Sequence, residues 1–406
     1  MKDTLVDLAA LGGTPEFSRF LQVGTPSVGD RSRLFDRLNT AMDNEWLTNG
    51  ALVREFEERI ADLAGVRHCV ATCNGTLALQ LLYMATGLSG EVVMPAMTYV
   101  ATPHAARVLG LTPVFCDVDP VTGCLDPEQV EAAVTPRTSG IVGVHLWGRP
   151  GRADELEKVA ARHGLTLTFD AAHALGSSFQ GRRVGGFGAA EVFSFHATKV
   201  VNCFEGGAVV TDDDGLAQEL RVLRTFGITA DGRSVGIGTN AKMTEASAAM
   251  GLTSLDAFGE TVRHNRANHA HYRSALRGVD GLSVVDFDEQ EDPNWQYVIL
   301  KIDEAVTGIH RDLMIEVLTA ENAGARRYFS PACHQLEPYR SERPTSLPHT
   351  ERLAEQVVAL PTGPAVSPTD IDRICHIVRL AISHGPELTD RLRRRAAPPS
   401  TAGSGT

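Results

Sequence analysis

The chain has 406 residues, 43% of them hydrophobic, which is enough for one large and one small domain with buried cores. A formal net charge of -12 argues against a nucleic-acid-binding surface, and no apolar run reaches the length of a membrane span. The seven cysteines are scattered without a CxxC pair, which indicates reduced thiols in a cytoplasmic protein and no zinc or other metal site.

The first part of the chain contains a polar turn between two helical patterns. Residues 1–30 lack periodicity and a signal-peptide core, so we expect irregular chain there. A helical pattern covers 31–44, and the polar stretch WLTNG follows at 46–50. The next helix ends at Gly65, and its apolar face consists of Val53, Phe56, Ile60 and Leu63.

From residue 67 onward, short apolar strands alternate with helices. The strands are expected at 68–73, 91–94, 113–117, 140–146 and 165–169. The helices are expected at 76–86, from about 102, at 127–134 and at 153–163. This βα alternation predicts an α/β fold with a mostly parallel sheet between helices. Ligands of such sheets bind at the carboxyl ends of the strands.

Residues 192–211, VFSFHATKVVNCFEGGAVVT, read as strand, break and strand, with Lys199 in the break. An ammonium group between apolar segments is costly unless it is paired, neutralised or used covalently. Such an environment makes lysine an amine nucleophile that can form a Schiff base. A lysine that extends from a strand end into solvent explains this stretch equally well when it is taken alone.

The pattern changes after residue 210. Helices are expected at 216–223, 245–258 and 261–276, followed by a strand at 296–302, a helix at 310–322, a short strand at 326–329 and a last helix at 371–382. Ser367, Pro368 and Asp370 form a start signal for that helix. We therefore expect an N-terminal segment and large domain over 1–260, a small domain over 261–390 and a disordered tail over 391–406.

Asn74, Gly75 and Thr76 follow the first strand of the alternating region. A glycine lets the backbone approach an anion, and the start of the next helix offers free N–H groups. The tripeptide is a candidate phosphate cradle. An ordinary Asn-Gly turn capped by threonine is the alternative.

Asp170 ends a strand and is followed by His173. A carboxylate in this position could keep the nitrogen of a pyridine ring protonated and so deepen an electron sink. His173 could bond a phenolic oxygen of the same ring, and Tyr99 could stack on its face. A helix-capping Asp170, a structural His173 and a packing role for Tyr99 are the alternatives.

Six motifs occur together in a fixed order: Asn74-Gly-Thr, Pro95-x-x-Thr-Tyr99, Asp170-Ala-Ala-His, Ser194-Phe-His-Ala-Thr-Lys199, Glu205-Gly-Gly and Gly238-Thr-Asn-Ala-Lys-Met243. Each motif alone is weak, but the ordered set resembles the nucleotide-sugar aminotransferases of the DegT/DnrJ/StrS type from about residue 21 to 382. The resemblance implies the fold-type I architecture, a large domain with a mostly parallel seven-stranded sheet and a smaller C-terminal α/β domain. It also implies the cofactor pyridoxal 5'-phosphate.

The resemblance assigns a role to each motif residue. Lys199 would hold the cofactor as a Schiff base and then act as acid and base for the proton shift. Asp170 would pair with the pyridine nitrogen, His173 would contact the phenolic oxygen, and Tyr99 would stack on the ring. A related branch has histidine in place of the lysine and dehydrates sugars, so Lys199 favours transamination.

The cofactor phosphate would be held by Gly75, Thr76 and Ser194. In the family an asparagine of the partner subunit completes this site, and Asn240 matches it, which implies a homodimer with shared active sites. The family often has an aromatic residue before this asparagine and an arginine two after it. Here Thr239 and Lys242 stand in those places, which puts the substrate contacts there in doubt.

The combination of WLTNG and GTNAKM resembles the branch that acts on nucleotide-linked 4-keto-6-deoxyhexoses, with dTDP as the carrier and L-glutamate as amino donor. Such enzymes supply amino sugars for antibiotics or surface glycans. Thr48 and Asn49 would line the sugar site, although a simple turn also explains them. Arg326, Tyr328 and His334 match a family segment near the substrate, and an arginine suits a diphosphate.

Three other functions compete with this one. Transfer to carbon 3 of a 3-keto sugar keeps the same enzyme class. A cofactor-binding sensor without turnover keeps only the fold. A nucleotide-dependent oxidoreductase needs a full GxGxxG motif after a strand, and the glycine-rich segment at 185–188 lacks that spacing and precedes a strand.

Overall fold

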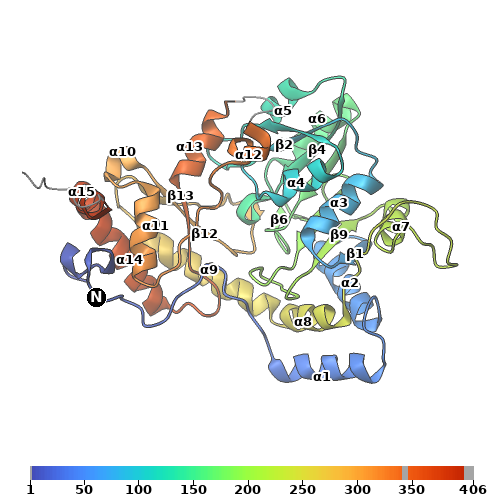
Figure 1. The fold of residues 1–406 in the computed structure, drawn as a ribbon, viewed down its shortest axis with the longest axis horizontal. Helices are drawn as coiled ribbons and strands as arrows, with labels where there is room; N and C mark the ends of the chain where they lie inside the picture. Colours follow the sequence, from blue (N-terminus) through green and yellow to red (C-terminus); the bar gives the residue numbers. More distant parts are fainter. Residues whose placement is uncertain (1, 341–345, 397–406) are drawn as a thin grey trace, which may run out of the picture.

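A seven-stranded sheet lies at the centre of the larger part of the molecule. It contains β1 (His68–Thr72), β2 (Glu91–Pro95), β3 (Thr112–Cys116), β4 (Thr138–Val144), β5 (Thr166–Asp170), β8 (Ala190–Ser194) and β9 (Gly207–Thr211). This computed structural model describes residues 2–340 and 346–396. The strand order is β1-β9-β8-β5-β4-β2-β3. The sheet lies in the right half of the molecule in Figure 1. Only β9 runs antiparallel to its neighbours, so the predicted mostly parallel sheet is confirmed.

Helices cover both faces of this sheet. They are α1 (Arg31–Asp43), α2 (Ala51–Ala64), α3 (Gly75–Ala85), α4 (Ala101–Val108), α5 (Pro127–Ala133), α6 (Ala153–His163), α7 (Asp214–Leu223) and α8 (Glu245–Asp256). Consecutive apolar residues of a strand enter different cores: Val93 packs in the core that contains α2, α6 and α8, and Val92 in the core that contains α3, α4 and α7. Strands buried on both faces need continuous apolar runs, which is why the sequence showed them clearly.

The C-terminal part has its own core around a three-stranded sheet. This sheet contains β10 (Leu282–Val284), β12 (Val298–Ile302) and β13 (Val357–Leu360). Its helices are α9 (Phe258–Ala275), α10 (Glu304–Thr307), α11 (Arg311–Ala320), α12 (Glu337–Arg340), α13 (Pro348–Gln356), α14 (Pro368–Ser383) and α15 (Gly385–Ala396). A further small sheet joins β6 (Ser178–Phe179), β7 (Arg182–Arg183) and β11 (Glu291–Asp292). None of the helices in the described ranges is both long and apolar enough to cross a bilayer.

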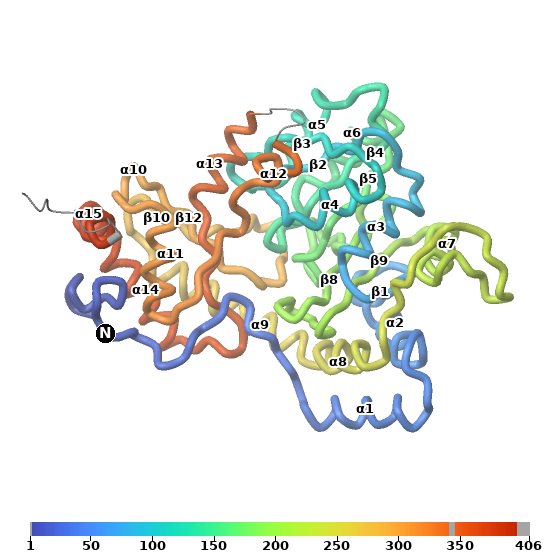
Figure 2. Tube along the Cα trace, viewed as in Figure 1, coloured from blue at the N-terminus to red at the C-terminus, as the bar shows by residue number. Residues whose placement is uncertain are grey.

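The N-terminal segment packs on the C-terminal part of the chain (Figure 2). It contains two short 3₁₀ turns, η1 (Leu5–Asp7) and η2 (Ala9–Leu11), where irregular chain was expected. The apolar side chains that it contributes to the C-terminal core are Leu5, Leu8, Phe17 and Leu21. The buried carboxylate of Glu321 accepts hydrogen bonds from the amides of Ala9 at 2.6 Å and Glu16 at 2.7 Å, which fixes the segment in place.

Two expectations for the C-terminal region are wrong. Residues 391–396 complete α15 and are not disordered, because ion pairs one turn apart and the buried Leu388 and Leu392 stabilise that helix. The rest of the expected tail, 397–406, lies outside the described residues. The short strand expected at 326–329 is a single bridge between Arg326 and Ala359.

Asp117, directly after β3, ties the large sheet to the start of α13. Its side chain is buried and accepts hydrogen bonds from the amides of His349 at 3.0 Å and Thr350 at 2.7 Å and from the Thr350 hydroxyl at 2.7 Å. Burial raises the pKa of this carboxyl, but the hydrogen bonds outweigh burial and leave the pKa below its usual value of 3.8.

We expect Asp117→Ala to lower the free energy of unfolding by about 2–3 kcal/mol at neutral pH, because it leaves buried donors at the start of α13 without an acceptor. A carboxyl with a lowered folded-state pKa stabilises fully above its unfolded pKa, and this stabilisation is lost as the pH falls through the folded value. Urea unfolding of the wild type and of Asp117→Ala should therefore show a difference in free energy of unfolding that becomes smaller below about pH 4. Thr350→Ser keeps the hydroxyl donor and serves as the control. A difference in free energy of unfolding between the wild type and Asp117→Ala that does not depend on pH would contradict this account.

Candidate active site

One cavity of about 680 Å³ opens at the carboxyl ends of β5 and β8, beside the start of α3. Most of the residues predicted to form the site line it: Gly75, Thr76, Tyr99, Asp170, His173, Ser194, Lys199, Arg326 and Tyr328. The last two come from the C-terminal part of the chain, so the cavity lies between the two parts. No group of His, Cys, Asp and Glu that could hold a metal ion occurs in the described part of the chain.

Lys199 lies in the loop after β8. Its backbone amide donates to the carbonyl of His196 at 2.8 Å, and its Nζ donates to the hydroxyl of Tyr297 at 3.1 Å. Burial lowers the pKa of this amine from 10.5 to about 8, and the charge of Asp170 opposes the shift only in part. The amine therefore carries a neutral fraction near neutral pH, as a lysine nucleophile requires.

Asp170 ends β5 with a buried carboxylate. The carboxylate accepts hydrogen bonds from the Thr102 hydroxyl at 2.7 Å and the Ala172 amide at 3.1 Å. Thr102 is itself bonded to the hydroxyl of Thr98 at 2.8 Å. These contacts fix the orientation of the carboxylate. The carboxylate can still accept a further hydrogen bond, such as one from a protonated ring nitrogen in the cavity.

His173 is held as a neutral imidazole. Its Nδ1 accepts a hydrogen bond from the backbone amide of Trp147 at 3.3 Å, so the ring proton belongs on Nε2. Burial lowers the pKa of His173 well below its usual value, and the nearby Lys199 charge lowers it further. This tautomer makes Nε2–H a donor for a phenolic oxygen of a bound ring.

The start of α3 forms an anion cradle. Asn74 caps the helix by accepting from the Leu77 amide at 2.8 Å, while the amides of Gly75 and Thr76 have no acceptor among the described residues. A Cβ at Gly75 would lie 3.2 Å from Cβ and 3.4 Å from Oγ of Ser194, so a side chain at position 75 would press on the Ser194 hydroxyl in the cradle. Free amides at a helix start and a nearby hydroxyl suit a phosphate.

These residues fit pyridoxal 5'-phosphate. The cradle matches its phosphate, Asp170 its ring nitrogen, His173 its phenolic oxygen and Lys199 its aldehyde carbon, all within one cavity. When bound, the cofactor supplies the electron sink that makes a proton on the amino-bearing carbon removable. The chain offers the polar groups that would orient the cofactor, and the Lys199 amine that would take up or give a proton there.

His334 lies outside this cavity, against the expectation that it contacts the substrate. Its ring is buried, and Nε2 bonds the Glu351 carboxylate of α13 at 3.0 Å. The neighbouring Cys333 turns the segment inward by bonding the backbone of Ala96 and Thr98. The family segment is present in the sequence, but this packing directs the imidazole towards α13.

Asn240 and the WLTNG turn also lie away from the cavity of their own chain. Asn240 is exposed and accepts from Nζ of Lys242 at 2.6 Å. In the turn, Thr48 is exposed, and the Asn49 amide donates to the carbonyl of Met243 at 3.2 Å. Asn49 adopts a left-handed φ of 50°, which asparagine tolerates, and its buried Oδ1 has no partner in the described structure.

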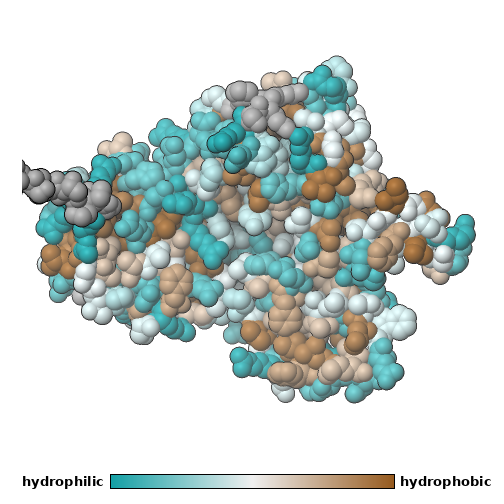
Figure 3. Space-filling model, in the orientation of Figure 1, coloured by the Kyte–Doolittle hydropathy of each residue, from teal (hydrophilic) through white to brown (hydrophobic). Residues whose placement is uncertain are grey.

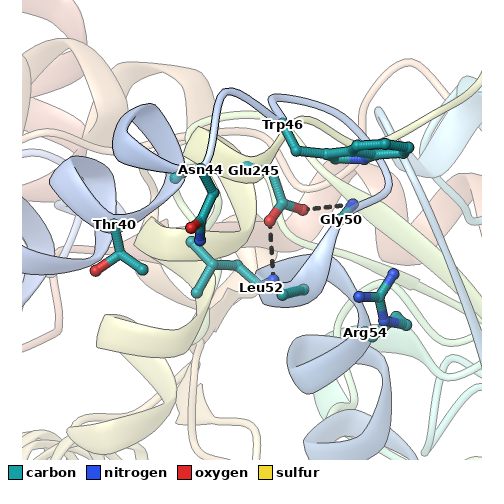
Figure 4. A pocket seen from close by; sticks show the side chains of 9 residues that line it. Thr40, Asn44, Trp46, Gly50, Leu52, Arg54 and Glu245 are labelled. Atoms are coloured by element: carbon teal, nitrogen blue, oxygen red, sulfur yellow. Dashed lines mark hydrogen bonds between the residues drawn. The ribbon is translucent and has the colours of Figure 1, made fainter.

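Glu245, the first residue of α8, holds this turn in place. Figure 4 shows its carboxylate directed at the backbone amides of Gly50 and Leu52. These amides donate to the carboxylate oxygens at 2.8 Å and 2.9 Å. Gly50 is the cap residue of α2 and has no side chain to bond these amides, so Glu245 supplies the capping acceptor from another helix. Nothing in the local sequence marks Glu245 for this role, because α2 and α8 are far apart in the chain.

Tyr297, Thr102 and Phe329 were missed as well. Tyr297 belongs to a segment interpreted only as an apolar strand, and the ring of Phe329 lies 5.7 Å from that of Tyr99. The spacing of Thr98 and Thr102, four residues apart after a strand, is the one signal that could have identified a paired hydroxyl contact near the site.

Comparison with known proteins identifies the class of protein. The chain matches the DegT/DnrJ/EryC1/StrS aminotransferase family over residues 30–379 and belongs to it. It is a pyridoxal-phosphate-dependent sugar aminotransferase with the fold-type I architecture.

Three solved structures to which the chain is similar give points of comparison. A crystal structure of DesI in the presence of its TDP-sugar product is 61% identical, covers 96% of this chain and 100% of its own, and has a TM-score of 0.94. DesV of S. venezuelae, in complex with a ketimine intermediate, is 32% identical over 87% of this chain and 95% of its own, with a TM-score of 0.82. The structure of 3-amino-5-hydroxybenzoic acid synthase is 28% identical over 91% of this chain and 100% of its own, with a TM-score of 0.82.

We expect Gly75→Ala to weaken cofactor binding about tenfold or more, because the new Cβ crowds Ser194 in the phosphate cradle. The dissociation constant can be measured by titrating cofactor-free protein with pyridoxal phosphate and following the visible absorbance. Gly259→Ala is the matched control, since its Cβ would lie 3.6 Å from the flexible Arg263 side chain within α9. Equal affinities for the two variants would contradict the cradle.

Proposed function

We propose that this enzyme transfers the amino group of L-glutamate to carbon 4 of a dTDP-linked 4-keto-6-deoxyhexose. The observation that carries the proposal is the likeness to DesI, whose structure was determined in the presence of its TDP-sugar product, at 61% identity over 96% of this chain. The WLTNG and GTNAKM segments support carbon 4, since their combination resembles the 4-keto branch of the family. Amino-sugar synthesis for an antibiotic or a surface glycan is the proposed context.

Arg326 is the proposed contact for the sugar-nucleotide diphosphate. It lines the cavity, its side chain is exposed, and no carboxylate pairs with it in the described residues. The adjacent Arg327, by contrast, is engaged by Asp312 at 2.6 Å. An unpaired guanidinium at the cavity mouth suits a diphosphate, and Tyr328 beside it offers a ring and a hydroxyl to the sugar.

Four residues carry the proposed chemistry. Nζ of Lys199 takes the proton from the α-carbon of the amino donor and later delivers a proton to the sugar carbon that receives the amine. Asp170 holds the ring nitrogen in its protonated form, and His173 donates from Nε2 to the phenolic oxygen. Tyr99, which lines the same cavity, stacks on the ring face.

We also propose a homodimer in which Asn240 completes the phosphate site of the partner subunit. Asn240 is exposed and belongs to the segment between α7 and α8, and the loop that follows α7 projects from the molecule on the right of Figure 1. This loop exposes Phe226, Val235 and Ile237, whose side chain is 88% exposed. Exposed apolar side chains also lie on and after α1: Phe35, Met42, Trp46 and Leu47. α1 forms the lower edge of the molecule in the view of Figure 3, and hydrophobic surface is visible there. Apolar groups exposed in this way suit contact with a second copy.

Thr48 and Asn49 sit beside these exposed side chains, so we propose that they reach the sugar site of the partner subunit. The large and small domains are proposed to divide near residue 260, at the start of α9. The proposed location is the cytoplasm, where the seven cysteines, all unpaired, would stay reduced.

The substrate is tested by product NMR. The purified enzyme with glutamate should convert the dTDP-4-keto-6-deoxyhexose into a product that carries nitrogen on carbon 4, and should leave the 3-keto isomer unchanged. Amination of the 3-keto sugar alone would move the reaction to carbon 3. Cofactor binding without glutamate-driven conversion to the pyridoxamine form would support the sensor function.

The shared site is tested by mixing two inactive variants, Lys199→Ala and Asn240→Ala. If Asn240 acts in the partner's site, a mixed dimer has one site with both intact residues, and activity should return to about a quarter of the wild-type value after random subunit exchange. If Asn240 acts within its own chain, every site lacks one residue and mixing restores nothing. Light scattering confirms that the variants remain dimers.

A further inference from the structure

A strap of four residues, 294–297, runs from the C-terminal part of the chain to the wall of the cavity, which its last residue, Tyr297, lines. Its first residue, Asn294, is buried and donates to the carbonyls of His173 at 2.9 Å and Leu175 at 3.0 Å. The Asn294 side chain also accepts from the amide of Gln296 at 3.0 Å. The strap is therefore anchored on the loop that carries His173.

The other end of the strap contacts the lysine loop twice. The carboxamide oxygen of Gln296 accepts from the amide of Val200 at 3.0 Å, and the hydroxyl of Tyr297 accepts from Nζ of Lys199 at 3.1 Å. The Tyr297 ring lies 4.6 Å from that of His173. Two neighbouring residues thus contact the backbone and the amine of the same loop, and one of them also packs on the histidine of the site.

The backbone of the strap is strained between these contacts. Trp295 has a φ of 57°, a left-handed conformation that is unfavourable for a bulky side chain. Its indole is held by the rings of His269 at 4.8 Å and Phe287 at 5.1 Å. Such strain persists where surrounding contacts fix it, and it is common at functional sites.

We propose that Tyr297 is a catalytic residue of this transaminase, whose hydroxyl holds the Lys199 amine in the cavity by accepting a hydrogen bond from it. Gln296 is the positioning residue that fixes the backbone of the same loop. The inference rests on the proposed role of Lys199 in moving the proton. The proposal adds Tyr297, which lies 98 positions from the lysine in the sequence, as the residue that sets the position of the Lys199 amine and its affinity for a proton.

The direction of the effect follows from the charges involved. A phenol oxygen that accepts from an ammonium group favours the charged amine, so loss of the hydroxyl lowers the pKa of Lys199. Burial raises the pKa of Tyr297 well above its usual value, so the hydroxyl stays un-ionised and acts as a neutral acceptor. The other titratable groups that line the cavity with Lys199 are Tyr99, Asp170, His173, His196, Glu205, Arg326 and Tyr328.

Tyr297→Phe tests the proposal because it removes only the hydroxyl. The first readout is the pH dependence of Lys199 acetylation by trace acetic anhydride in cofactor-free protein, quantified by peptide mass spectrometry. We expect the half-point to move to lower pH by about one unit, a tenfold change in proton affinity. The second is the pH profile of kcat, whose rising limb should move the same way while the maximum falls about 100-fold.

Tyr272→Phe is the matched control. Tyr272 is also buried, and its hydroxyl bonds the carbonyl of Pro361 at 2.9 Å in the C-terminal core, away from the cavity. This variant should leave the acetylation half-point and the rising limb unchanged. A Tyr297→Phe protein whose acetylation half-point equals the wild-type value would overturn the proposal, even if kcat fell, because a structural role alone produces that result.

The same samples separate this proposal from the role of Lys199. Lys199→Ala should lose the visible absorbance of the lysine-linked cofactor, whereas Tyr297→Phe should keep it. If Lys199→Ala kept the absorbance, the proposed role of Lys199 would be contradicted, and the proposal for Tyr297, which depends on it, would be contradicted as well. If Lys199→Ala lost the absorbance and Tyr297→Phe shifted nothing, only the Tyr297 proposal would fail.

Discussion

The burial of one amine, that of Lys199, is the constraint on which the site depends. Removing an ammonium group from water is unfavourable, and here burial lowers its pKa to about 8. The charge of Asp170 and a hydrogen bond to the Tyr297 hydroxyl stabilise the charged amine and offset part of this unfavourable free energy. The result is an amine that can exist in both protonation states at neutral pH, which proton transfer in both directions requires.

The two parts of the chain are needed together to create that environment. The larger part supplies the carboxyl ends of β5 and β8, where Asp170 and Ser194 lie. The C-terminal part supplies Tyr297, Tyr328 and Phe329, which close the cavity from the other side. Buried contacts such as those of Asp117 with α13 hold the two parts in a fixed relative position.

Much of the fold was predictable, because strands buried on both faces must be apolar throughout and helices need periodic apolar faces. The residues of the candidate cofactor site were predictable for a related reason. Gly75, Asp170, Ser194 and Lys199 each follow or end a strand, so the topology brings them to one edge of the sheet. Their order along the chain was enough to indicate the family, which the comparisons confirm.

Contacts set by tertiary packing were not predictable. Tyr297 reaches Lys199 across 98 residues, and nothing local marks it as different from an apolar strand residue. His334 matches a family segment, yet Glu351 binds its ring away from the cavity. The helix at 391–396 looked disordered because its arginines dominate the composition, while its stability comes from ion pairs one turn apart and two buried leucines.

The central claim is that Lys199 is the residue that binds pyridoxal phosphate covalently. Borohydride reduction of the purified enzyme, followed by proteolysis and mass spectrometry, tests it most directly. The account predicts a phosphopyridoxyl group on Lys199 and on no other lysine. A modified lysine elsewhere in the chain, or a protein that takes up the cofactor without any modified lysine, would contradict it.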